Sequence, residues 1–146
     1  MTTEPAIELT LGHPKWDQAL PVLQSLRPHL DRPNLDQLLR EGAPQGLRFT
    51  GLFDGDTCLA VAAWRIMAST TSMRRFYIDA IAAAPDARNR GHGGELFRLL
   101  VERARQLRCE TVELTAAVDR FDSHRFFIQQ RMQISGHQFH LVLDED

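Results

Sequence analysis

The sequence contains few cysteines, the residues whose disulfide bonds or bound zinc stabilise many small or extracellular proteins. Its 146 residues include only two cysteines, Cys58 and Cys109, which are far apart and have no neighbouring cluster of histidines. We therefore expect neither a disulfide framework nor a zinc site, and we interpret both thiols as small apolar groups. A chain of this length is expected to form one domain with its own core.

Long apolar runs and an excess of positive charge are also missing. The longest uninterrupted apolar run, Cys58–Trp64, is far shorter than the roughly 20 residues that span a membrane. The first residues, Met1–Thr10, carry no basic segment of the secretory type, so we expect a cytoplasmic protein. A formal net charge of -2 argues against a general nucleic-acid binder. We expect neither a nucleic-acid nor a membrane partner.

The spacing of apolar residues predicts a mixed order of strands and helices. Strands are expected at Ala6–Leu11, Leu47–Phe53, Cys58–Met67, Phe76–Ala83, Thr111–Thr115, Met132–Ile134 and Phe139–Leu143. Helices are expected at Trp16–Leu26, after a cap at Asn34, after Gly91 and at Asp122–Gln130. The first helix either begins at Pro21 or is kinked there, and Asp54-Gly55-Asp56 predicts a hairpin turn. This order predicts an α/β domain with a mixed, mainly antiparallel central sheet flanked by helices.

The most informative segment joins the strand Phe76–Ala83 to the helix that follows Gly91. It reads Pro85-Asp86-Ala87-Arg88-Asn89-Arg90-Gly91-His92-Gly93-Gly94. Glycines let backbone N–H groups approach a ligand, and the N-terminus of a helix favours an anion. Arg88 and Arg90 add positive charge that suits a phosphate. The segment indicates a diphosphate site, and the alternative is a glycine-rich helix start with solvated arginines.

Two common phosphate-binding motifs do not fit this segment. A Walker A loop ends in Gly-Lys-Ser/Thr, whereas this loop ends in Gly93-Gly94-Glu95. A Rossmann fingerprint requires a third glycine where this chain has Leu96, and it opens a repeated βαβ array. The strands that precede this loop predict antiparallel pairing instead.

The six residues Arg88-Asn89-Arg90-Gly91-His92-Gly93 resemble the signature of the GNAT N-acyltransferase superfamily. That signature is Arg/Gln-x-x-Gly-x-Gly/Ala at a junction of strand and helix. The segment Asp122–Phe127 is similar to the family's second cofactor helix, and the resemblance runs from about Phe76 to Leu143. Before Met67 only the order of elements supports it. The resemblance implies a single GNAT-like domain over residues 1–146.

Acetyl-CoA is the co-substrate that this resemblance implies. Its pyrophosphate would bind the N–H groups at the helix start, and its pantetheine arm would pair with the Phe76–Ala83 strand like an additional strand. The implied coenzyme A-binding residues are Ile81, Ala82, Ala83, Arg88, Asn89, Arg90, Gly91, His92, Gly93, Gly94, Ser123 and Phe127. For the alanines, tight packing beneath a helix is an equally good interpretation.

The implied reaction is the direct attack of an amine on the thioester carbonyl, for which the amine must lose a proton. Asp79 is the first candidate for the base, because strand alternation places it on one face with Tyr77, Ile81 and Ala83. Glu113 is the second candidate. The alternative is that both are ordinary polar strand residues.

Two positions depart from the family's pattern. Phe127 stands where many members have a tyrosine that protonates the leaving thiolate, and Tyr77 is the only tyrosine in the chain. Arg131-Met132 stands where the family usually has Gly-Phe. Neither change removes the implied coenzyme A site, but Phe127 leaves open whether the chain turns over.

These residues are compatible with three alternative functions. The first is an N-acetyltransferase that acts on a primary amine of a small molecule or a protein. The second is a non-catalytic acyl-CoA-binding module, and the third is an interaction protein without a ligand, against which the arginines and glycines argue.

The closing strands could pair between subunits and form a homodimer. No metal site is expected from His124, His137 and His140, because their spacing does not bring them together.

Overall fold

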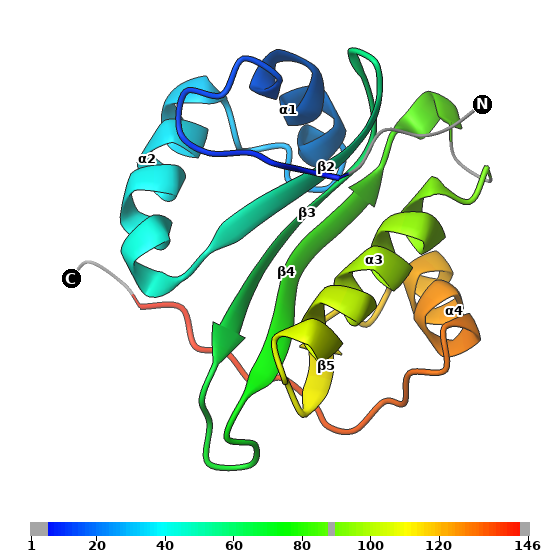
Figure 1. Cartoon of the computed structure of the whole chain (residues 1–146). Coiled ribbons are helices and arrows are strands. Elements are labelled where there is room, and N and C mark those ends of the chain that lie inside the picture. The colour runs from blue at the N-terminus through cyan, green and yellow to red at the C-terminus, as the bar shows by residue number, and fades with distance from the viewer. Residues whose placement is uncertain (1–5, 88–89, 144–146) are drawn as a thin grey trace. The chain divides into compact units, whose positions relative to one another are not determined.

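The computed structural model of the chain describes residues 6–87 and 90–143, which fall into two compact units (Figure 1). The described residues up to Leu114 form the first unit, and those from Thr115 onward form the second. The first unit holds the sheet and the helices α1 to α3, and the second holds the helix α4. None of the helices in the described residues is long and apolar enough to cross a membrane.

The first unit is built on a five-stranded sheet in the order β1-β2-β3-β4-β5. The strands are β1 (Ile7–Glu8), β2 (Arg48–Asp54), β3 (Thr57–Met67), β4 (Arg75–Ala83) and β5 (Thr111–Leu114). Neighbouring strands are antiparallel except β4 and β5, which are parallel because the helix α3 (His92–Gln106) connects them. The predicted mixed, mainly antiparallel sheet flanked by helices is confirmed.

A tight hairpin joins β2 to β3 at the predicted Asp-Gly turn. The strands close on the pair Asp54 and Thr57, and Gly55 between them has a φ of 60°. Only a glycine or a small polar residue adopts this left-handed conformation at low cost. The turn therefore forms as the sequence predicts.

The two N-terminal helices differ in detail from the prediction. Helix α1 (Trp16–Gln24) begins at Trp16 and continues through Pro21, so it does not start at the proline. Helix α2 (Arg32–Gly42) is capped by Asp31, whose Oδ1 accepts a hydrogen bond from the Asn34 backbone N–H at 2.9 Å. The cap is thus three residues earlier than expected, since the carboxylate of Asp31 reaches the N–H at the third helical position.

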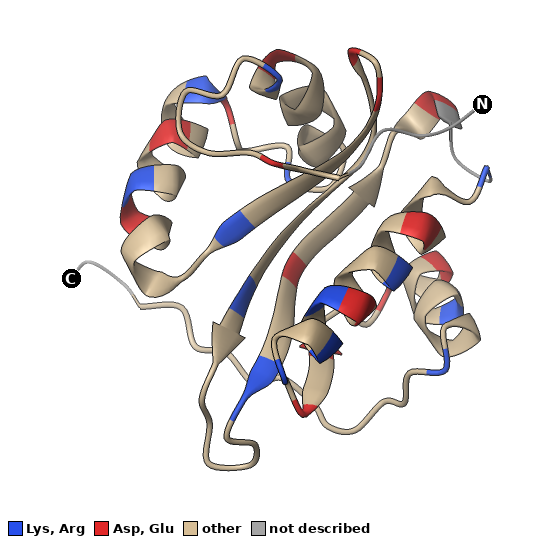
Figure 2. Cartoon of the chain, viewed as in Figure 1, with Lys and Arg blue, Asp and Glu red and all other residues tan. Residues whose placement is uncertain are grey.

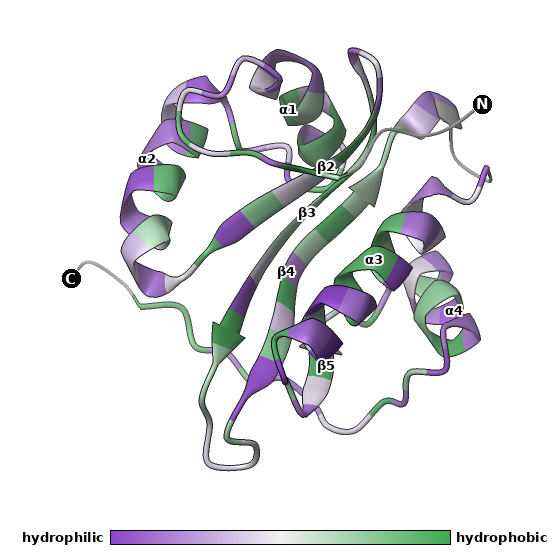
Figure 3. Ribbon diagram, in the orientation of Figure 1, coloured by the Kyte–Doolittle hydropathy of each residue, from purple (hydrophilic) through white to green (hydrophobic). Residues whose placement is uncertain are grey.

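One side of the sheet packs against α1 and α2 through the larger hydrophobic cluster. Trp16 is completely buried there, with its ring 5.2 Å from that of Phe49 and its Nε1 donating to the Thr10 carbonyl at 2.9 Å. Val61 and Ala63 of β3 belong to the same cluster. Figure 3 shows the hydrophobic residues concentrated on the central strands and on the helix sides turned toward them.

The opposite side of the sheet packs against α3. The alternate residues of β3 point this way, and Trp64 stacks on Phe76 of β4 with 4.6 Å between the ring centroids. Leu96 and Leu100 of α3 are buried because the helix lies across β3 and β4. The first unit therefore has three layers, with the sheet in the middle.

The second unit contains α4 (Phe121–Gln129), which has no buried residue, followed by residues 130–143 without helix or strand. The predicted strands Met132–Ile134 and Phe139–Leu143 are therefore wrong. Apolar alternation is a local property, whereas a strand also needs a neighbour that pairs its N–H and C=O groups. These residues have no ladder partner in the described part of the chain, and Phe139 is 92% exposed.

The close packing of Gly51 in β2 makes a first prediction. A Cβ at Gly51 would lie 2.5 Å from Cε1 of Phe53 and 3.1 Å from Cδ1 of Leu9, and both side chains are fully buried. Gly51→Ala should therefore lower the free energy of unfolding by about 1–3 kcal/mol, measured by urea unfolding. Gly136→Ala, where a Cβ would meet nothing within 4 Å, is the control and should change stability little. Equal stability of both variants would contradict this packing.

Candidate functional site

A β-bulge in the middle of β4 organises the surroundings of the candidate site. Ala63 of β3 pairs with Ala80, whereas the next residue, Trp64, pairs with Ile78. Asp79 is therefore one extra residue on β4 without a partner on β3. Such a bulge re-aims the side chains that follow it, and bulges are frequent beside active sites.

The bulge changes the side of the sheet toward which the side chains of β4 point. Before it, buried Phe76 stacks on Trp64 on the α3 side, whereas Ala80, Ala82 and Ala84 after it belong to the cluster beneath α1 and α2. Ala83 faces α3, since a Cβ on Gly93 would lie 3.8 Å from its own Cβ. The predicted common face of Asp79, Ile81 and Ala83 is therefore wrong, because simple alternation ignores the extra residue.

Asp79 borders a cavity of about 250 Å³ on the α1–α2 side of the sheet. Its polar lining is Arg27, His29 and Asp79, and its apolar lining comes from α1, α2 and the sheet. Arg27 Nη2 donates a hydrogen bond of 3.0 Å to the backbone carbonyl of Asp79. No local sequence pattern indicates Arg27 or His29, because the contact joins residues 52 positions apart.

The start of α3 forms a cradle of backbone N–H groups beside the end of β4. Gly91 caps the helix in the left-handed conformation with a φ of 83°, and a Cβ there would meet nothing within 4 Å. Gly93 comes within an ordinary contact of Ala83, and Gly94 is buried in the helix. The three predicted glycines thus lie at an unobstructed helix N-terminus, which suits an anion.

The polar side chains at this cradle also suit an anionic ligand. His92 Nδ1 is buried without a hydrogen-bond partner, its nearest carboxylate oxygen being that of Glu95 at 3.9 Å. Arg90 is exposed beside the helix start. Arg88 and Asn89, which the sequence also assigns to this site, lie outside the described residues. The orphaned nitrogen and the open glycine backbone fit a phosphate group, which would accept hydrogen bonds from them.

The far half of β4 has a free edge next to this cradle. The pairing of β4 with β5 covers Arg75 to Ile78 and ends there, so the residues from Asp79 onward have no strand on that side in the described chain. Ile81 and Ala83 are half-buried, whereas the side chain of Ala82 is buried in the α1–α2 cluster. The backbone of Ile81–Ala83 therefore offers an edge to which an extended ligand can add.

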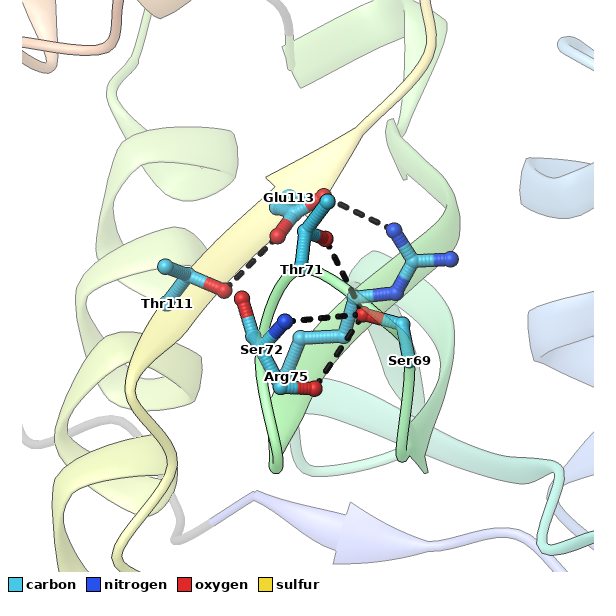
Figure 4. Close-up of polar contacts among 6 residues, drawn as sticks. All are labelled: Ser69, Thr71, Ser72, Arg75, Thr111 and Glu113. Carbon is cyan, nitrogen blue, oxygen red and sulfur yellow. Dashed lines mark hydrogen bonds and ion pairs between the residues drawn. The ribbon is translucent and has the colours of Figure 1, made fainter.

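Glu113, the second candidate base, has a different environment (Figure 4). Its Oε1 lies 3.0 Å from Arg75 Nη1, and its Oε2 accepts a hydrogen bond of 2.8 Å from Thr111 Oγ1. In the register of the sheet Glu113 is opposite Tyr77, six residues before Ala83. At about 3.3 Å per residue that separation is about 20 Å, so Glu113 is distant from the cradle. The ion pair indicates a structural role.

Two further predicted residues belong to the second unit. Ser123 and Phe127 lie on α4, where the ring of Phe127 packs edge to face on Phe126 with 5.1 Å between the centroids. These residues stay predictions as parts of the site. The five residues Arg90–Gly94 and the strand Ile81–Ala83, in contrast, are brought together within the first unit.

Other reactive groups do not form a second site within the described residues. Burial raises the pKa of the Cys58 thiol to about 12, opposed by a hydrogen bond to the Ala60 carbonyl. The thiol therefore stays protonated at neutral pH and is a poor nucleophile. No three His, Cys, Asp or Glu side chains are grouped to hold a metal ion in the part of the chain that is described. Figure 2 shows acidic and basic residues mixed along α2 and α3, so these helices present no face of one sign.

Comparisons with known proteins show the family and the fold of the chain. The sequence model of the acetyltransferase (GNAT) family matches residues 15–132. A search of the curated proteins by sequence finds no match.

Solved structures share the fold at low sequence identity. The aminoglycoside N-acetyltransferase AAC(6')-Iy in complex with CoA superposes with a TM-score of 0.81, at 11% identity over 98% of this chain and 97% of that one. A ribosomal-protein-alanine N-acetyltransferase from Brucella melitensis biovar Abortus gives a TM-score of 0.79, at 15% identity over 97% and 100%. An aminoglycoside acetyltransferase from an uncultured soil metagenomic sample gives 0.76, at 14% identity over 95% of each chain.

Alanine substitutions at two of the three cradle glycines, Gly91 and Gly93, should affect stability differently. Gly91→Ala places a side chain at a φ of 83° and should lower the free energy of unfolding by about 1–2 kcal/mol. Gly93→Ala meets only an ordinary contact inside a helix and should leave stability unchanged or raise it by up to about 1 kcal/mol. Thermal unfolding of both variants measures the difference. A loss of stability in Gly93→Ala as large as that in Gly91→Ala would contradict the described backbone.

Proposed function

Because the chain belongs to the GNAT acetyltransferase family, we propose that it transfers an acetyl group from acetyl-CoA to a primary amine by direct attack. The match of the family model over residues 15–132 supports acetyltransferase activity in general. The finer proposal depends mainly on one observation, the cradle at the start of α3 beside the free edge of β4. The acceptor amine belongs to a small molecule or to a protein.

The first unit holds the groups that would bind coenzyme A. The N–H groups from Gly91 to Gly94 and the side chains of Arg90 and His92 would donate to the pyrophosphate, and Arg88 and Asn89 are proposed to contribute there as well. The backbone of Ile81–Ala83 would pair with the pantetheine arm. Ser123 and Phe127 are proposed to complete the site from α4.

When bound, acetyl-CoA supplies a thioester carbonyl that an amine can attack. In the proposed reaction the nitrogen of the neutral amine forms a bond to the carbonyl carbon and releases one proton, and the carbon–sulfur bond breaks, which leaves an N-acetylated amine and the thiolate. The thiolate then takes up one proton. Holding both partners in one place supplies the proximity that this step needs.

Asp79 is the residue that we propose as the base. An alkyl ammonium has a pKa near 10.4, so only a small fraction is neutral at pH 7, and a base that removes its proton raises the rate. The bulge places Asp79 at the cavity, where it is exposed and has no hydrogen bond or ion pair through its carboxylate among the described residues. It can therefore accept a proton from the amine directly or through water.

No tyrosine is needed to protonate the leaving thiolate. Phe127 has no hydroxyl, and Tyr77 lies opposite Glu113 at the paired end of β4. A thiol has an ordinary pKa near 8.5, so a thiolate is a tolerable leaving group that water can protonate. Binding without turnover would instead favour the non-catalytic acyl-CoA-binding module.

A charge reversal at the cradle tests the coenzyme A site. Arg90→Glu should weaken acetyl-CoA binding roughly 10- to 100-fold, because it replaces a charge-assisted hydrogen bond to phosphate by a repulsion. Isothermal titration calorimetry with acetyl-CoA measures this loss. Arg98→Glu is the matched control, since Arg98 is exposed on the same helix farther from its start. If the parent chain does not bind acetyl-CoA, or if both variants lose affinity equally, the proposed cradle is wrong.

A pair of carboxamide variants tests the proposed base. Asp79→Asn should lower kcat by roughly 10²–10⁴, with part of the rate restored at high pH as solvent deprotonates the amine. Glu113→Gln removes the charge that pairs with Arg75; it should retain the activity and cost at most about 1 kcal/mol of stability. Initial rates of CoA release between pH 6 and 10 check both variants. A larger loss in Glu113→Gln than in Asp79→Asn would reverse the assignment.

A further inference from the structure

The cavity beside Asp79 is lined by Arg27, which has no carboxylate partner among the described residues. Arg27 is half-buried, and one of its five N–H groups is held by the Asp79 carbonyl. No carboxylate of the described residues lies within 4.0 Å of its guanidinium, whereas Arg32 nearby contacts Asp17 at 3.0 Å and Asp36 at 3.6 Å. His29 borders the same cavity and brings no negative charge. The cavity is therefore lined by a cationic group that suits an anion.

The other polar group of the cavity has the opposite sign. Among the described residues of the lining Asp79 is the only acidic one, and its backbone carbonyl accepts the hydrogen bond from Arg27. Two residues of opposite charge thus line one small space, and a hydrogen bond joins the side chain of one to the backbone of the other. A ligand complementary to both carries an ammonium and a carboxylate close together.

The remaining lining is entirely apolar. It consists of Leu23, Leu30, Leu38, Phe49, Ala63 and Ala80. A cavity of about 250 Å³ is smaller than the roughly 300–1,000 Å³ of sites for drug-sized ligands. The space therefore suits a single small molecule with an apolar body.

We propose that the acceptor is a free α-amino acid with an apolar side chain, with Arg27 as the specificity-determining residue that binds its carboxylate. In this arrangement Asp79 faces the amine, Arg27 and His29 face the carboxylate, and the apolar lining holds the side chain. This inference rests on the proposed acetyl transfer and names its substrate class. A polycationic amine with several rings, such as an aminoglycoside, fits this cavity poorly, because it exceeds the space and meets the positive charge of Arg27.

Direct binding of acceptors tests the proposal without requiring turnover. L-Leucine and L-leucine amide have the same shape and the same ammonium, but only leucine has the carboxylate. Each is titrated by calorimetry into the full chain in the presence of CoA, which cannot react. The parent should bind leucine roughly 10- to 100-fold more tightly than the amide, the range expected for a charge-assisted hydrogen bond.

Two variants assign that preference to Arg27. Arg27→Met keeps much of the apolar stem while removing the charge, and it should bind leucine and its amide equally weakly. Arg40→Met is the matched control, since Arg40 is exposed in the last turn of α2 and does not line the cavity. It should keep the preference for leucine.

Three results would overturn this inference. They are a parent chain that binds neither compound, a parent that binds the amide as tightly as leucine, and an Arg27→Met variant that weakens both compounds by the same factor. The last result would indicate that Arg27 only supports the backbone at Asp79. Failure of the proposed acetyl transfer is a separate result, because it is seen as absent acetyl-CoA binding or as absent acetylation of every amine tested.

Discussion

The pairing of β3 with β4, with one residue more on β4, is the constraint on which the candidate site depends. Because Asp79 has no partner on β3, the alternation of side chains along β4 shifts by one residue at this point. Every second residue before Asp79 therefore faces one side of the sheet, and the residues that continue the same spacing after it face the other side. Phe76 can then pack on the α3 side while Ala80 packs under α1 and α2. The bulge also places Asp79 at the cavity and leaves Ala83 facing the start of α3. A single local irregularity thus turns Ala80 toward the cavity and Ala83 toward the start of α3.

The parts of the fold that follow from neighbouring residues were predictable from the sequence. The Asp-Gly turn between β2 and β3 depends on the conformational freedom of Gly55, and the helix after Gly91 depends on its own apolar periodicity. The cradle belongs to this group, because its glycines and Arg90 lie within five consecutive residues. Even the cap of α2 was missed by only three positions, since Asp31 and Asn34 are both suitable capping residues.

The parts that depend on partners distant in the sequence were not predictable in this way. The face taken by Asp79 depends on its register against β3, and the hydrogen bond from Arg27 crosses 52 residues. The pairing of Glu113 with Arg75 likewise joins two strands, so no local pattern indicated that this candidate base forms an ion pair. The expected closing strands failed for the same reason, because alternating apolar residues such as Phe139 and Leu141 do not specify a neighbouring strand.

The separation of the two faces of β4 also has an evolutionary consequence. Residues that would select the acceptor come from α1, α2 and the cavity side of the sheet, whereas the cradle is carried by the far end of β4 and the first turn of α3. Substitutions in one group leave the other in place, so a lineage can change the molecule that it modifies while it keeps the donor. Such a division is compatible with a fold that persists among structures sharing only 11–15% of their residues with this chain.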